Sequence, residues 1–299
     1  MDSDRSENMV ARLALIGVLV NIGLAGVKLV AGLLGHSYAL IADAIESLVD
    51  IVGSLVIWLG IKYAQRPPDA EHPYGHGRAE SLAALAVAGM VVLAGIGIAI
   101  KSIEEILTPK HAPAWWTLLV LVVVVIVKET MARVASGAAR RVGSTVGAVD
   151  AGHHRSDALT SLAAFIGILI AVVAGPGWES ADDWAALVAS GIILFNGYKL
   201  ARPPLDELLD RQPDELVARA VEIAGAVAGV NRVQKAWARK SGHCYYIDMH
   251  VWVDPRMEVV EAHRISHAVK DSVRGELRSV RDVLVHIEPD GSHQGSTRV

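Results

Sequence analysis

Residues 81–100, SLAALAVAGMVVLAGIGIAI, contain no Asp, Glu, Lys or Arg. A helix needs about 20 apolar residues to cross a hydrocarbon core of roughly 30 Å, and this run is long enough. A second run without acidic or basic residues covers residues 158–178. Both runs predict membrane-spanning helices.

Four further stretches are mostly apolar but carry isolated charges, and we expect them to span the membrane as well. They are residues 10–34, 38–63, 114–137 and 181–200. The first is too long for a cleaved signal peptide and lacks a small-x-small cleavage site. The sequence therefore predicts an α-helical membrane protein with six transmembrane helices.

The composition agrees with a membrane protein. Of 299 residues, 52% are hydrophobic and the mean hydropathy is +0.38, which is more apolar than one soluble core requires. The 28 Lys and Arg residues and 32 Asp and Glu residues give a net charge of −4, which argues against a nucleic-acid partner. The single cysteine, Cys244, excludes an internal disulfide and a Cys-based zinc site, so a metal site must use His and carboxylate ligands.

Basic residues mark one side of the predicted membrane domain. They occur before the first span, between the second and third, between the fourth and fifth, and after the sixth, whereas the opposite loops carry only Lys110. By the positive-inside rule, both termini lie in the cytoplasm. The short chain without a transit segment favours the inner membrane of a bacterial cell.

The composition changes after Pro203-Pro204, where charges recur every few residues. The periodicity there predicts a helix at 213–228, strands at 230–239 and 244–253, a helix at 258–277 and a strand at 283–288. This order is typical of a small α+β domain of ferredoxin-like type. We expect a cytoplasmic tail at 1–9, a transmembrane domain at 10–204, a cytoplasmic domain at 205–289 and a disordered tail at 290–299.

Two charged pairs lie inside predicted spans. Glu46 and Asp50 are four residues apart in the second span, and His153 and Asp157 repeat this spacing in the fifth. A carboxylate near the bilayer centre costs about 2.5–3.5 kcal/mol when it is uncompensated, and stacked like charges gain nothing without a cation. The two pairs can close around one cation as a four-ligand shell.

Ordinary structural roles remain open for these charges. They can lie at helix ends near the headgroups, or pair with Lys28 and Arg155. Asp43 and Asp150 lie one or two turns from the two pairs. These carboxylates either hydrogen-bond to a metal ligand or are exposed at a helix end.

Two further groups of candidate ligands lie outside the spans. The loop after the second span holds one carboxylate and two imidazoles, and its Pro and Gly residues favour a bent path: Asp69, His72 and His76. In the cytoplasmic domain, strand and helix periodicity places several polar side chains away from the core, with the last two on one side of their strand: His250, His263, His286 and Glu288. Spacing alone leaves open whether the members of this second group meet.

The order and spacing of these motifs resemble the cation diffusion facilitator family of divalent-metal transporters, from about Val10 to Pro289. The matching stretches are SYALIADAIESLVD at 37–50, YGHGRAE at 74–80, HHRSD at 153–157, RKSG at 239–242, DMHV at 248–251, EAH at 261–263 and HIEP at 286–289. Members are typically homodimers in a lipid bilayer that exchange a cytoplasmic divalent cation for protons.

The resemblance implies three metal sites. They are a transport site (Glu46, Asp50, His153 and Asp157), a loop site (Asp69, His72 and His76) and a cytoplasmic site in a dimerisation domain (His250, His263, His286 and Glu288). Two departures affect these sites. Glu46 stands where many members carry His or Asp, and Asn231-Arg232 stands where some supply another ligand.

We therefore expect a secondary transporter, not an enzyme, that exports Zn²⁺ and takes up protons. Three oxygens and one nitrogen suit tetrahedral Zn²⁺ but also tolerate Fe²⁺, Mn²⁺ or Cd²⁺ with added water. No cofactor is expected beyond the transported metal, which can also regulate the transporter. Two alternatives stay open: a membrane-embedded hydrolase with Glu46 as general base, and a metal sensor that does not transport.

Overall fold

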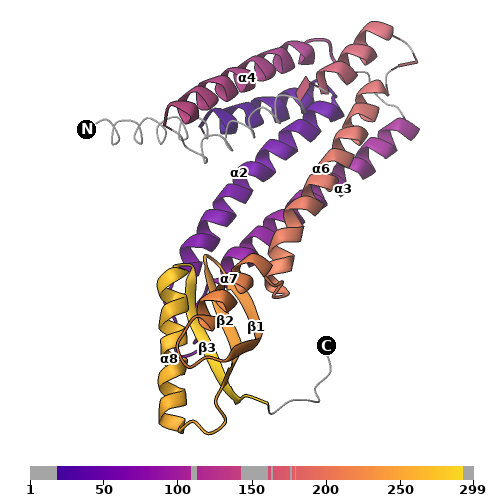
Figure 1. The fold of residues 1–299 in the computed structure, drawn as a ribbon. Helices are drawn as coiled ribbons and strands as arrows, with labels where there is room; N and C mark the ends of the chain where they lie inside the picture. Colours follow the sequence, from indigo (N-terminus) through magenta and orange to yellow (C-terminus); the bar gives the residue numbers. More distant parts are fainter. Residues whose placement is uncertain are drawn as a thin grey trace. The chain divides into compact units, whose positions relative to one another are not determined.

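The computed structural model describes residues 19–108, 113–142, 161–162, 164–175, 177–178 and 180–291 (Figure 1). The chain divides into two compact units. One combines the residues up to Val56 with Ala86–Ala201, and the other combines Ile57–Leu85 with the residues from Arg202 onward.

The first unit is helical. By length and composition α2 (Tyr38–Ala64), α3 (Arg78–Leu107) and α6 (Ala181–Leu208) can cross a membrane, and the apolar helices Leu19–Leu34 and Ala164–Ala174 are shorter. With α4 (Thr117–Val142), every predicted span coincides at least in part with a helix. Large apolar side chains are exposed along these helices, such as Leu93 at 69% and Val188 at 61%. Such an outer surface suits contact with hydrocarbon.

The end of α6 differs from the sequence prediction. The sixth span was expected to end at Leu200, but the helix continues through Pro203 and Pro204 to Leu208. Each proline removes a backbone donor. Tertiary contacts hold the extension: Glu207 accepts hydrogen bonds from the Lys240 ammonium at 2.9 Å and the Gly242 N–H at 3.1 Å.

The start of α2 is capped from a distant part of the chain. The Ser37 hydroxyl accepts a hydrogen bond from the Leu40 N–H at 3.2 Å and donates one to Asp182 at 3.0 Å. The other Asp182 oxygen accepts from the N–H groups of Tyr38 and Ala39 at 2.7 and 3.4 Å. Asp182 is buried. A carboxylate at a helix N-terminus satisfies first-turn donors and complements the helix dipole.

The second unit contains an α+β domain, as predicted. Its order is α7 (Asp214–Gly225), β1 (Arg232–Ser241), β2 (Cys244–Val253), α8 (Val259–Glu276) and β3 (Val280–Pro289). β2 is the central strand, antiparallel to β1 and parallel to β3. Alternate residues of β2 join the core with the apolar faces of α7 and α8: Ile247, Met249, Val251 and Val253. The alternate side chains, including His250, therefore lie on the other face of the sheet.

Candidate metal centres

The predicted transport site begins on α2. Glu46 and Asp50 lie four residues apart on this helix, and both are half-buried. This spacing places the two carboxylates on one helix face. His153 and Asp157, the other predicted ligands, lie outside the described residues, as do Asp150 and Arg155.

Lys28 makes its contacts with Asp43 and Ser47. Its fully buried ammonium lies 2.9 Å from an Asp43 carboxylate oxygen. It also donates to the Asp43 carbonyl at 3.1 Å and the Ser47 hydroxyl at 2.7 Å. Asp43 is 4% exposed, so the alternative that it is exposed at a helix end is wrong.

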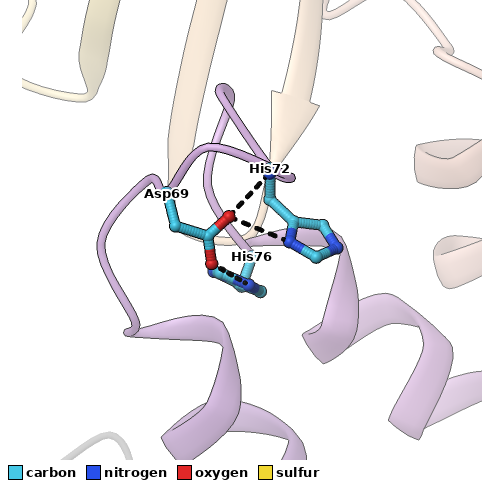
Figure 2. Close-up of side chains that lie close together, drawn as sticks. All are labelled: Asp69, His72 and His76. Carbon is cyan, nitrogen blue, oxygen red and sulfur yellow. Dashed lines mark hydrogen bonds and ion pairs between the residues drawn. The ribbon is translucent and has the colours of Figure 1, made fainter.

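The loop site is brought together by a short turn (Figure 2). Asp69, His72 and His76 offer ligand atoms within 4.8 Å of one another. One Asp69 oxygen lies 2.7 Å from the His72 N–H and 3.1 Å from its Nδ1, and the other lies 3.4 Å from Nε2 of His76. One carboxylate and two imidazoles form a donor set that suits Zn²⁺ and similar transition metals.

The electrostatics of the loop keep its carboxylate ionised. The His72 N–H, donating to Asp69, is the main reason that the pKa of this carboxyl lies below its ordinary value. His76 is buried at the base of the turn, and its ring stacks edge-on with Tyr63 at 5.1 Å between centroids. Asp69 and His72 are exposed. A cation therefore has open access to two of the three ligands.

The loop packs closely against the β1–β2 turn. A Cβ atom at Gly77 would lie 2.6 Å from Ser241, so only glycine fits here without a shift. The Tyr246 hydroxyl donates to the Tyr74 carbonyl at 3.0 Å. A cavity of about 490 Å³ between loop and hairpin is lined by His72, His76 and other residues of both segments. The loop ligands therefore rest on the α+β domain.

The second cluster lies on the open face of the sheet. His250, His286 and Glu288 offer ligand atoms within 4.8 Å of one another. Parallel pairing of β2 and β3 sets His250 opposite His286, with ring centroids 4.9 Å apart. Glu288 lies 2.7 Å from Nδ1 of His250 and 3.8 Å from Nε2 of His286. The sheet thus brings three of the four predicted cytoplasmic ligands together.

His263 is not a member of this cluster in the single chain. It lies on α8, where its ring stacks against His267 at 4.6 Å between centroids. The position associated with a further ligand in some relatives is also engaged elsewhere: Asn231 donates to Asp290 at 2.9 Å, and the Arg232 guanidinium lies 4.0 Å above the Trp252 ring.

Sequence reasoning missed Trp252. Its indole N–H donates to a Glu288 oxygen at 2.7 Å, opposite the oxygen that faces His250. Burial raises the pKa of Glu288, but the hydrogen bonds from His250 and Trp252 outweigh burial, so this pKa lies below its ordinary value. Strand alternation could have predicted that Trp252 lies near the cluster, because Trp252 and His250 are two residues apart and therefore lie on the same face of β2.

Two protein-family models match this chain, and together they cover most of it. Residues 14–209 match the family model of the cation efflux transmembrane domain, and residues 212–290 match that of the cation efflux protein cytoplasmic domain. The chain is 29% identical over 294 residues to the manganese efflux system protein MneP of Bacillus subtilis, covering 97% of this chain and 99% of MneP.

Two further proteins are similar to this chain, one over most of its length and one over a quarter of it. The cation-efflux pump FieF of Cronobacter sakazakii is 29% identical over 286 residues, covering 94% of this chain and 93% of FieF. A solved MamM CTD structure is 34% identical over 25% of this chain and 95% of its own, with a TM-score of 0.25.

The two family models together match nearly the whole chain, and they divide it into a helical membrane domain followed by a cytoplasmic α+β domain. This division corresponds to the predicted fold class. These matches therefore support a multi-pass membrane protein that transports divalent metal cations, and the hydrolase alternative falls away. The chain belongs to the cation diffusion facilitator family, whose members are transporters and not enzymes.

Proposed function

We propose that the protein exports Zn²⁺ from the cytoplasm in exchange for protons. The observation that carries this proposal is the pair Glu46 and Asp50, stacked on one face of an apolar helix in a member of this family. Two carboxylates this close in a membrane helix require a compensating cation. His153 and Asp157 complete the proposed shell.

Donor chemistry supports zinc as the metal. Each of the two described clusters combines two imidazoles with one carboxylate, and imidazole favours Zn²⁺ over Mn²⁺. Manganese is the second candidate, because MneP, a manganese efflux protein, aligns with nearly the whole chain. The three oxygens proposed for the transport site tolerate Mn²⁺ when water completes the shell.

Proton exchange supplies enough driving force. Moving two positive charges outward against 100 mV requires about 4.6 kcal/mol, and each entering proton returns about 2.3 kcal/mol. A pH gradient adds roughly 1.4 kcal/mol per unit and proton. Metal binds to the deprotonated ligands, and their protonation from the outer side releases it.

The remaining sites and the assembly complete the proposal. Asp69, His72 and His76 hold a metal at the loop, and His250, His286 and Glu288 hold a regulatory metal on the cytoplasmic domain, with His263 joining from α8. The transmembrane domain covers 10–204 and the cytoplasmic metal-binding dimerisation domain 205–289. The protein is a homodimer in a bacterial inner membrane with both termini in the cytoplasm.

Metal flux into proteoliposomes under an imposed pH gradient tests the proposal. We expect gradient-dependent Zn²⁺ flux that exceeds Mn²⁺ flux and is abolished by Asp50→Asn. The control is Asp271→Asn, which makes the same change on an exposed position of α8. Faster Mn²⁺ flux would reverse the metal ranking. Metal binding without flux of any metal would identify a sensor.

A further inference from the structure

A buried cluster lies on the same helix as the transport carboxylates. Lys28, on the helix Leu19–Leu34, is fully buried, and its ammonium contacts three acceptors on α2: a carboxylate oxygen of Asp43, the carbonyl of Asp43 and the hydroxyl of Ser47. An ammonium has three N–H donors, so all three are satisfied. These contacts fix Lys28 and α2 against each other.

The second Asp43 oxygen connects α2 to another helix. It accepts a hydrogen bond of 2.8 Å from the hydroxyl of Ser161, which is itself fully buried. Ser161 lies just before the helix Ala164–Ala174. We call Lys28, Asp43, Ser47 and Ser161 the Lys28 cluster; it joins three helical segments through buried polar contacts.

The spacing of the cluster matches the spacing of the proposed ligands. Asp43 and Ser47 share a face of α2 with Glu46 and Asp50, because the four residues follow an i, i+3, i+4, i+7 pattern. Ser161 follows Asp157 by four residues in the sequence. The Asp43–Ser161 hydrogen bond therefore links α2 to a residue four positions after Asp157 in the sequence.

We propose that the Lys28 cluster positions the transport ligands, with Lys28, Asp43 and Ser161 setting the register between α2 and the segment that carries His153 and Asp157. This inference rests on the proposed function of Glu46 and Asp50. The cluster also limits the number of ligands. Because the Lys28 ammonium lies 2.9 Å from one Asp43 oxygen and would repel a second cation, we do not count Asp43 among the ligands of the transported metal.

Ser161→Ala tests this role with the smallest change. It removes the hydrogen bond between the segments and retains the charges of Lys28 and Asp43. Ser190→Ala is the matched control, because Ser190 is also buried but donates to the Leu187 carbonyl of its own helix. Zn²⁺ and Mn²⁺ flux into proteoliposomes is measured for both variants, together with their thermal unfolding in detergent.

We expect Ser161→Ala to raise the KM for Zn²⁺ about tenfold, since loss of a group that orients metal ligands typically weakens binding 10–100-fold. The Zn²⁺ to Mn²⁺ flux ratio should change as well, while the unfolding temperature falls by no more than about 5 °C relative to that of Ser190→Ala, as loss of one buried hydrogen bond predicts. Ser161→Thr retains the hydroxyl and should restore the native KM.

Three results would overturn the inference. The first is a Ser161→Ala KM and metal ratio equal to those of Ser190→Ala, while Asp50→Asn still abolishes flux; this leaves the proposed function intact. The second is a flux defect that accompanies a fall in unfolding temperature well beyond about 5 °C and is not rescued by Ser161→Thr, which shows a merely structural role. The third is absence of metal flux in the native protein, which overturns the proposed function together with the inference.

Discussion

Removing the Lys28 side chain should reveal the energetic role of its ion pair. In Lys28→Met the Asp43 carboxylate, 4% exposed, loses its charge partner 2.9 Å away and remains buried. Breaking a buried ion pair on one side costs about 3–5 kcal/mol, because the other charge is left uncompensated. We expect the unfolding temperature in detergent to fall by about 10 °C.

The double variant Lys28→Met/Asp43→Leu separates charge from packing. It leaves no buried charge within the Lys28 cluster, and the main loss is the partner of the Ser161 hydroxyl, which costs about 1–3 kcal/mol. The double variant should therefore be more stable than Lys28→Met, with a fall of about 5 °C. Scanning fluorimetry measures both. If Lys28→Met unfolds at the native temperature, or if the double variant is the less stable one, the argument from buried charge is wrong.

Three further predictions concern the second unit. His286→Ala should weaken Zn²⁺ binding at the sheet cluster at least tenfold in calorimetry, whereas His243→Ala, on an exposed residue outside the cluster, should leave it unchanged. Gly77→Ala should destabilise the packing of the loop on the β1–β2 turn by about 1–3 kcal/mol and weaken metal binding there, while Gly275→Ala, in open space, should do neither. Because the folded-state pKa of Glu288 is lowered, its stabilisation is present above pH 4.5 and is lost as pH falls through the lowered pKa; an NMR titration midpoint at or above 4.5 in the metal-free protein would contradict this.

The membrane helices were predictable because their signal is local. A run such as 81–100 must be a helix in lipid, where unpaired backbone groups are too costly. The end of α6 was not predictable from the same signal. Pro203 and Pro204 normally terminate a helix, and the contacts of Glu207 that hold the extension involve residues more than 30 positions later.

The candidate sites were also predictable only in part. Period-two alternation correctly placed His250 away from the core and His286 beside Glu288, but their convergence depends on the parallel register of β2 and β3, which α8 separates in the chain. The sequence left open which carboxylate pairs with Lys28. Asp43, Glu46 and Asp50 follow it by 15, 18 and 22 residues on another helix, and spacing alone does not choose among them.

The residue that caps the N-terminus of α2 is synthesised long after α2 itself. Asp182, which accepts from the first N–H groups of α2, follows Tyr38 by 144 residues. At a synthesis rate of about 5–20 residues per second, Asp182 is synthesised roughly 7–30 s after the start of α2. During this interval water or lipid headgroups must satisfy the same donors. The arrival of α6 therefore completes a helix that entered the membrane long before it, and a nascent chain that stops short of α6 leaves the ligand-bearing helix with an open end.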